Sequence, residues 1–385
     1  FAAFMPMIGA KSMQYSNGDE GKARRRAYGQ PAFSHAVCMD KHVDGLAAVT
    51  ERLVHDWQAL CANGSAEIVV DEHMMSFALR SICFTSLGGA DDATVASIRH
   101  AYDIAWHEME QRLMGSQPTP KREEAFRDAL QTISAIVNAA VARATSSDAA
   151  VAENHSLLAK LHQYVMAHAD GDMQIVHSDF ITFLVGGFHT TGNALIWMMW
   201  FLLSSRDVYT KVRVAVRDVL GDTVVPRSAA AVSALLKGYV GQVINETLRC
   251  SALAPWAARV SDSDVTLDSG IVIPAHTPIV IPLGVALLSN EHWRDANVFD
   301  PSRFAADADN IMQFKPFGFA GGRVCPGADF ARIELAIAVA ALVQAFDMAI
   351  AANHSVPDRH FGLVTRTSVP IRVRVQPRTS RLVNL

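Results

Sequence analysis

The stretch FKPFGFAGGRVCPG, residues 314–327, decides how this chain is interpreted. Its glycines allow sharp turns and a close approach of the backbone to a flat partner, because glycine has no Cβ. Pro326 stands where the first residue of a helix is expected, and apolar side chains recur at helical spacing over 328–346. We therefore expect a buried amphipathic helix with Cys325 at its N-terminus, where the helix dipole favours a thiolate.

A single cysteine in such a loop suits a haem iron. A thiolate on haem iron pushes electron density onto the metal and favours cleavage of an O–O bond. Backbone N–H groups can hydrogen-bond the sulfur, and Arg323 is placed to meet a haem carboxylate. The alternative is an inert buried cysteine. The other four cysteines take that interpretation, because the five show no metal-ligand spacing: Cys38, Cys61, Cys83 and Cys250.

Two further constellations precede the cysteine loop. Glu246 and Arg249 share a helix face at a spacing of three residues, although an isolated pair of this kind is usually a solvated surface pair. Residues 186–191, Gly-Gly-Phe-His-Thr-Thr, interrupt the apolar run over 180–203 with poor helix formers. They predict a locally opened helix of the π-bulge type, which often marks a functional site. The alternative is a notch where two helices pack.

Taken in chain order, these segments resemble the cytochrome P450 family. The order is an oxygen-groove motif at 186–191, a Glu-x-x-Arg helix, a Pro-x-Arg-Phe segment at 301–304, and the cysteine loop. The resemblance covers nearly the whole chain. Segments 15–34 and 346–378 resemble the family's C-helix and its terminal β-structure, and segments 72–81 and 282–287 resemble an animal group, P450 family twenty, whose substrate is unassigned. The resemblance implies a mainly α fold with small β-sheets (α+β).

The resemblance also implies roles for individual residues. Cys325 would be the axial ligand of the iron in haem b, and the propionate partners would be Arg25, Arg259 and Arg323. Further haem contacts would come from Phe317, Phe319, Gly321 and Gly187. A buried charge triad that locks the cysteine loop would comprise Glu246, Arg249 and Arg303. Thr190 would order oxygen and water in the groove, and His189 would supply protons. The alternative for His189 is an imidazole turned away and satisfied by a helix carbonyl.

Three departures from the family pattern affect these roles. Gly318 stands where the family usually has a phenylalanine, so we expect Phe317 or Phe319 to supply the missing packing. Gly21 stands where a haem-binding tryptophan is usual, so one propionate donor is lost. His189 replaces the usual acidic residue before the threonine, which changes the proton relay.

The implied activity is that of a haem-thiolate monooxygenase. It would insert one atom of O₂ into a lipophilic small molecule, with electrons from NADPH through NADPH–cytochrome P450 reductase or a similar donor. A haem-thiolate isomerase or dehydratase, and a degenerate haem-binding protein without turnover, remain alternatives. The net charge of −4 predicts no general attraction to nucleic acid. A local basic patch that meets an acidic reductase is expected from Lys22, Arg24, Arg25, Arg26, Lys315 and Arg323. For Arg24 and Arg26, a solvated helix face is the alternative.

The chain is expected to form one domain over residues 1–385, because it shows no repeat or low-complexity linker. The C-helix-like segment comes so early that we expect an N-terminally truncated form. The missing part would hold the first helix, most of the first sheet and the anchor that places full-length animal relatives at the endoplasmic reticulum membrane. No uninterrupted apolar run reaches the length of about 20 residues that spans a bilayer. The patterning predicts helices over 40–60, 68–87, 92–114, 121–145, 153–168, 174–204, 206–220, 228–250 and 327–346.

Overall fold

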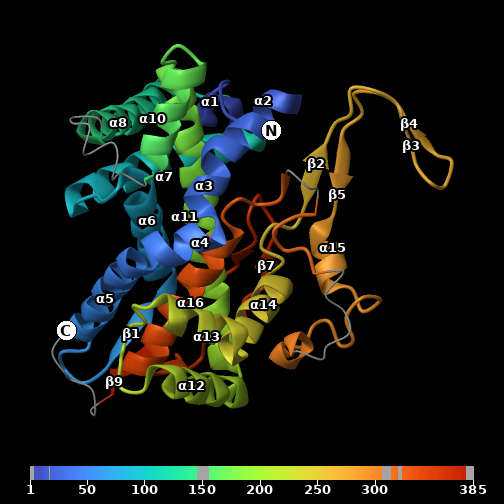
Figure 1. The fold of residues 1–385 in the computed structure, drawn as a ribbon. Helices are drawn as coiled ribbons and strands as arrows, with labels where there is room; N and C mark the ends of the chain where they lie inside the picture. The colour runs from blue at the N-terminus through green and yellow to red at the C-terminus, as the bar shows by residue number, and fades with distance from the viewer. Residues whose placement is uncertain (1–3, 17, 145–155, 306–313, 320–322, 379–385) are drawn as a thin grey trace.

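The computed structural model of the chain describes residues 4–16, 18–144, 156–305, 314–319 and 323–378. In these ranges most residues are helical, and the strands form small antiparallel sheets (Figure 1). The expected α+β class, mainly helical with small sheets, is confirmed.

The helices before the long central helix are α1 Met5–Ile8, α2 Gly18–Arg24, the π-helix η2 Arg25–Gly29, α3 Gln30–Phe33, α4 His35–Val37, the π-helix η3 Cys38–His42, α5 Val43–Leu60, α6 Val70–Leu87, α7 Asp92–Leu113, α8 Pro120–Ala144 and α10 Leu157–His168. The central helix and those after it are α11 Met173–Ser204, α12 Arg206–Leu220, α13 Ala229–Lys237, α14 Tyr239–Ser251, α15 Leu283–Leu288, the 3₁₀-helix η4 Pro301–Phe304 and α16 Ala328–Ala345.

Polar side chains fix where several helices begin. Asp91 accepts a hydrogen bond from the backbone N–H of Thr94 at the start of α7, and Asp172 does the same for Gln174 at the start of α11. Serines cap α10, α12 and α13 in the same way. Gly88 adopts a left-handed conformation directly after α6, which ends that helix. These signals explain why the expected helix boundaries agree closely with the observed ones.

The strands are β1 Ala66–Val69, β2 Ala257–Arg259, β3 Val265–Thr266, β4 Val272–Ile273, β5 Ile279–Ile281, β6 Phe346–Ile350, β7 Arg359–His360, β8 Arg366–Thr367 and β9 Arg372–Pro377. β9 lies between β1 and β6, so that Val375 pairs with both Ala66 and Met348. β2 pairs with β5, β3 with β4, and β7 with β8. The β3–β4 hairpin extends away from the helical body (Figure 1).

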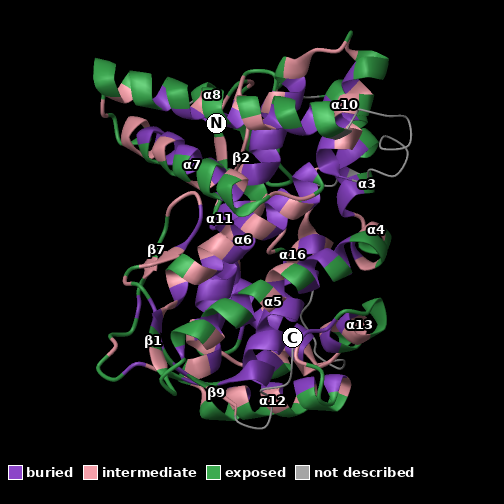
Figure 2. Ribbon diagram, turned by 90° about the vertical axis from the view of Figure 1, so that its left-hand side faces the viewer, coloured by how far each residue is buried: buried purple, intermediate pink, exposed green. Residues whose placement is uncertain are grey.

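The core is built around two largely buried helices, α11 and α16. α11 packs against α6, α10 and α14, and α16 packs against α5, α12, α13 and α14. Figure 2 shows both helices largely in the buried colour. From Ile333 to Ala345 every residue of α16 is buried, so the helix is enclosed on all sides rather than amphipathic as expected. The helix that follows the cysteine loop is therefore held rigidly in the centre of the molecule.

Two expected boundaries are wrong. The helix expected over 228–250 is two helices, because the extended backbone of Gly238 ends α13 and begins α14. Pro326 is not the first helical residue, because α16 begins at Ala328 with Gly327 before it. No helix within the described ranges combines the length and the apolar character needed to cross a membrane.

Candidate functional site

The cysteine loop closes through backbone hydrogen bonds. The Gly318 N–H donates to the Lys315 carbonyl at 3.0 Å, and the Cys325 N–H donates to the Phe317 carbonyl at 2.9 Å. Gly318 has a φ of +90°, a conformation that residues with a Cβ rarely adopt. This backbone explains why glycine stands where the family usually has phenylalanine. Gly321, a predicted cofactor contact, lies outside the described residues.

Cys325 is the exposed cysteine of the five, whereas the other four are buried. Desolvation by the surrounding protein atoms raises the pKa of its thiol above the usual value. The Gly327 N–H and the charge of Arg25 act in the opposite direction and favour the thiolate. Among the five cysteines, Cys325 is therefore the one whose side chain a metal ion could reach.

Three guanidinium groups from separate parts of the chain lie within electrostatic range of one another, and one of them, Arg25, acts on Cys325. The pKa of Arg25 is lowered by burial and then by the charges of Arg323 and Arg259. Burial and the charge of Arg259 lower the pKa of Arg323 as well. The structure thus brings together the three predicted propionate partners: one from η2, one from β2 and one just before the cysteine. Like charges placed this close favour an anionic partner.

Ser16 occupies the place of the missing tryptophan. A Cβ on Gly21 would lie 2.3 Å from the Ser16 carbonyl oxygen, so no larger residue fits this backbone. The same carbonyl accepts a hydrogen bond from Arg323 Nη2 at 3.1 Å. The glycine therefore leaves room for the Ser16 carbonyl, which accepts a hydrogen bond from Arg323, where the family usually has an indole side chain.

The groove motif lies within α11, which is an unbroken α-helix, so the predicted opening of this helix is wrong. Thr190 donates its hydroxyl hydrogen bond to the Gly186 carbonyl four residues earlier. A Cβ on Gly187 would meet Ile82 of α6 at 2.7 Å, whereas a Cβ on Gly186 would meet nothing within 4 Å. The packing notch, which was the alternative, is thus correct for Gly187. It is Gly186, with Thr190, that lies on the open side of the helix.

His189 is buried in an aromatic cluster. Its ring stacks on Trp106 with 4.4 Å between centroids and also contacts Tyr102 and Phe188. Burial and the nearby charges of Arg366 and Arg99 lower the pKa of His189 to about 3. A neutral imidazole held in this way gives no support to its predicted role as a proton source.

The two phenylalanines of the loop differ in their surroundings. Phe317 is partly buried against the core, and the Arg332 guanidinium lies 5.1 Å from the centre of its ring. Phe319 is 45% exposed. Phe317 is therefore the residue that supplies packing beside the loop.

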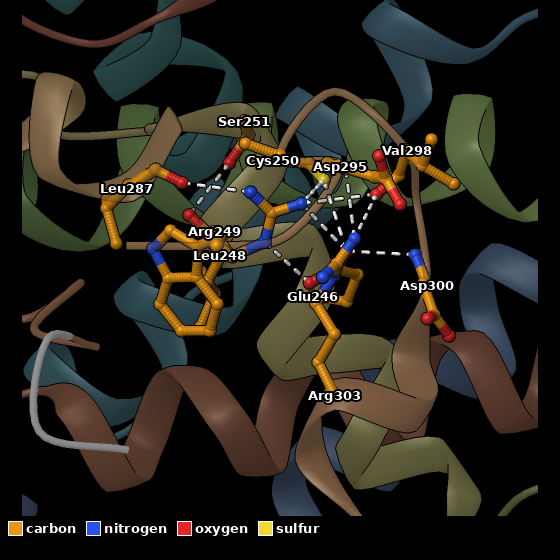
Figure 3. A network of polar contacts seen from close by, with 12 residues as sticks. Glu246, Leu248, Arg249, Cys250, Ser251, Leu287, Asp295, Val298, Asp300 and Arg303 are labelled. Carbon is orange, nitrogen blue, oxygen red and sulfur yellow. Dashed lines mark hydrogen bonds and ion pairs between the residues drawn. The ribbon is translucent and has the colours of Figure 1, made fainter. Parts of the chain in front are cut away.

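Glu246, Arg249 and Arg303 form one network (Figure 3). Glu246 and Arg249 are fully buried and joined by two hydrogen bonds of 2.7 and 2.8 Å. Arg303 Nε donates to Glu246 Oε1 at 3.3 Å, and the Asp300 N–H donates to the same oxygen at 2.9 Å. The predicted pair is a buried contact, so the surface alternative is wrong.

The comparison with known proteins agrees with this geometry. The family model described as Cytochrome P450 matches residues 5–375. The chain belongs to the cytochrome P450 family. Cytochrome P450 20A1 of Rattus norvegicus is 26% identical over 353 residues, which are 91% of this chain and 72% of that protein. A cytokinin hydroxylase of Arabidopsis thaliana is 35% identical over 201 residues, 52% of this chain and 38% of that protein. A crystal structure of a cytochrome P450 aligns with a TM-score of 0.84 at 20% identity, covering 98% of this chain and 86% of that one.

Cytochrome P450s are monooxygenases that bind haem b through a cysteine thiolate, and membership assigns this cofactor and this class of reaction to the chain. The surroundings of Cys325 fit the cofactor in two ways. An accessible cysteine whose sulfur accepts a hydrogen bond from a backbone N–H suits an iron ligand, and the grouped arginines suit two propionates. In the described residues, no group of three or more His, Cys, Asp or Glu side chains offers a separate metal site.

Sequence reasoning missed two buried carboxyl groups. Asp179 on α11 is paired with Arg24, which therefore does not belong to the expected basic patch or to a solvated helix face. Glu334 on α16 faces Ser81 and Thr191, and burial raises its pKa to about 8. An acidic residue next to the apolar run at 180–203 was the available signal for Asp179. Its partner, 155 positions away, was not visible in the sequence.

Proposed function

We propose that Cys325 is the axial thiolate ligand of haem b and that the protein inserts one oxygen atom of O₂ into a lipophilic small molecule. The observation that carries this proposal is the convergence of Arg25, Arg259 and Arg323, the first of which lies within electrostatic range of the accessible Cys325. The haem supplies oxygen activation when bound. The arginines neutralise and orient its propionates, and the Gly327 N–H moderates the basicity of the sulfur.

The open side of α11 carries the proposed distal group. Thr190, whose hydroxyl is partly accessible and bonded to the Gly186 carbonyl, would hold oxygen and water on this side. His189 stays neutral at physiological pH, so protons would reach Thr190 through water. The apolar residues at this end of α11, such as Phe183, favour a lipophilic substrate.

The buried network around Glu246 is proposed to hold the segment that leads into the cysteine loop. Glu246 binds both Arg303 and the backbone of Asp300, and Arg249 binds the Val298 carbonyl. The network thereby fastens residues 298–303 to α14. This role is structural, and its loss would release the chain that precedes the loop.

Electrons are proposed to come from NADPH through a flavin reductase of the cytochrome P450 reductase type. Lys22, Arg26 and Lys315 are exposed on the two segments that carry Arg25 and Cys325, and they suit an acidic partner. We propose the endoplasmic reticulum membrane as the location of the protein, in line with its similarity to animal P450s.

The test is the carbon monoxide difference spectrum of the reduced protein, which reports iron, thiolate and an open sixth position together. The wild type is expected to give the thiolate spectrum, and Cys325→Ser is expected to lose it. Cys38→Ser, a change at a buried cysteine, is the control and should retain the spectrum. An unchanged spectrum in Cys325→Ser would overturn the assignment.

Turnover separates the functional alternatives. Consumption of NADPH and O₂ that depends on a reductase supports the monooxygenase. Turnover of a peroxide without reductase would instead indicate an isomerase or dehydratase. A thiolate spectrum without any turnover would indicate a degenerate haem-binding protein.

A further inference from the structure

Asp179 is a fully buried carboxylate on α11 that receives three hydrogen bonds from the N-terminal part of the chain. The Met13 N–H and Arg24 Nη2 each donate at 2.6 Å, and the Tyr28 hydroxyl donates to the same oxygen as Arg24. Burial raises the pKa of Asp179, while the charge of Arg24 and these hydrogen bonds lower it. Each donor belongs to a segment more than 150 positions away, so the carboxylate ties two distant regions together.

The guanidinium of Arg24 is buried and makes several hydrogen bonds within this network. Its side chain is 3% exposed, its Nε donates to the Tyr28 hydroxyl at 2.9 Å, and its Nη2 also donates to the Lys11 carbonyl at 2.7 Å. A buried ion pair stabilises a fold only when its remaining hydrogen bonds are satisfied, and such a pair serves mainly to fix one arrangement. This pair fixes the arrangement of residues 24–28 on α11.

Those residues carry Arg25. The α-helix α2 ends at Arg24, and the π-helix η2 begins at Arg25 and ends at Gly29. Arg24, which bonds Asp179, is thus the last residue before the chain changes from α-helix to π-helix. Burial and the charges of Arg323 and Arg259 lower the pKa of Arg25, and the charge of Asp179 acts in the opposite direction. Asp179 is thus close enough to Arg25 for the two charges to interact.

The same segment also contacts the cysteine side of the site. The ring of Tyr28 meets Phe183 edge to face at 6.4 Å between centroids. A Cβ on Gly29 would lie 3.7 Å from Phe183 and 3.8 Å from Pro326. A shift of η2 on α11 would therefore move Arg25 relative to the cysteine loop.

We propose that Asp179 is a positioning residue for the haem site, which holds η2 on α11 and so sets where Arg25 meets a haem propionate. This inference rests on the proposed function. Gly21 offers no side chain to bind a propionate, because a Cβ at this position would meet the Ser16 carbonyl. Binding of the propionates therefore depends more strongly on where Arg25 lies.

The experiment measures the rate at which ferric, haem-loaded protein loses haem to an excess of apomyoglobin. Asp179→Asn is expected to accelerate the loss about tenfold, in line with a charge-assisted hydrogen bond. In the Arg25→Gln background, which itself loses haem faster, the same change should have less than about a twofold further effect, because a residue that acts through Arg25 is not additive with it. Glu108→Gln, which breaks another buried carboxylate bonded to two arginines, is the matched control and should leave the rate unchanged.

Additive effects of Asp179→Asn and Arg25→Gln, or an equal effect of Glu108→Gln, would show a merely structural role and overturn the inference. Should Asp179→Asn not fold, Tyr28→Phe removes one donor and is expected to change the rate in the same direction by a smaller factor. A normal rate in Tyr28→Phe would then contradict the proposal. A wild type that bound no haem would contradict the proposed function itself, whereas unchanged haem loss in the variants would contradict the role of Asp179 alone.

Discussion

Arg249 uses its guanidinium almost completely inside the protein. It donates to both oxygens of Glu246, to the Leu287 carbonyl at 2.9 Å and to the Val298 carbonyl at 3.3 Å, and it lies 5.3 Å from the ring centre of Trp293. Its side chain is inaccessible to solvent. An arginine that binds three separate segments fastens them together, so its removal affects more than one ion pair.

Replacing Arg249 with alanine should leave the buried charge of Glu246 without its main partner. Loss of one member of a buried pair costs about 3–5 kcal/mol, so we expect Arg249→Ala to yield little haem-loaded protein and a correspondingly lower free energy of unfolding. The molar ratio of haem to protein measures the loading, and urea unfolding measures the change in free energy. Arg213→Ala, at the partly exposed pair with Asp347, is the control and should cost about 0–1 kcal/mol. Full haem content in Arg249→Ala would refute the assignment.

For single residues, the sequence predicted contacts only between positions that lie close together in the chain or belong to an ordered motif. Glu246 and Arg249 share a helix face at a spacing of three, so their contact followed from helical geometry. The pairing of Arg24 with Asp179 did not, because nothing in a local pattern joins residues 155 positions apart. His189 carried a role that depended on solvent access, and its burial against Trp106 could not be inferred from its neighbours in sequence.

At the scale of elements, the π-type winding that the sequence predicted for part of α11 occurs elsewhere in the chain. The glycines of the groove motif indicated a π-bulge, yet α11 is regular and Gly187 serves close packing against α6. A π-helix occurs instead at Arg25–Gly29, which carries a predicted haem partner. The second π-helix, η3, carries no predicted site residue, so π-type winding alone does not identify the site, and composition alone did not place η2.

Two neighbouring glycines of α11 provide a matched test of this packing. A Cβ on Gly187 would lie 2.7 Å from two atoms of Ile82, so Gly187→Ala should destabilise the protein by about 1–3 kcal/mol through overpacking. A Cβ on Gly186 meets nothing within 4 Å, so Gly186→Ala should be neutral or stabilising by about 0.5–1 kcal/mol. Urea unfolding of both variants compares them. Equal stabilities would show that α6 and α11 do not pack as closely as described.

For the whole molecule, the site depends on contacts that no single segment contains. η2, β2 and the cysteine loop each contribute one of three arginines whose charges act on one another, and Arg24, the residue before Arg25, is bonded to Asp179 of α11. The resemblance to a family named these three arginines as propionate partners, and that role stays a prediction. Their mutual proximity and the hydrogen bonds of Asp179 depend on contacts between distant segments, so neither could be derived from the sequence.

The core also contains two groups whose protonation differs between the folded and unfolded states. The pKa of His189 falls from 6.5 to about 3, so between these values the unfolded chain binds more protons and stability decreases as the pH falls. The pKa of Glu334 rises from 4.5 to about 8, because burial outweighs the opposite effect of the Ser81 and Thr191 hydroxyls. Between those values the folded chain binds more protons, and stability decreases as the pH rises.

These two effects oppose each other between pH 4.5 and 6.5 and act alone outside that window. We therefore predict a plateau in the free energy of unfolding there, a fall toward pH 3 due to His189 and a fall toward pH 8 due to Glu334. A full proton difference changes stability by about 1.4 kcal/mol per pH unit. Urea unfolding across this range should show that Glu334→Gln flattens the alkaline limb and extends the acid slope up to pH 6.5. His189→Phe should flatten the acid limb and extend the alkaline slope down to pH 4.5. Parallel curves for wild type and Glu334→Gln up to pH 8 would mean that Glu334 titrates as freely in the folded core as in the unfolded chain, which is incompatible with its enclosure between α6, α11 and α16.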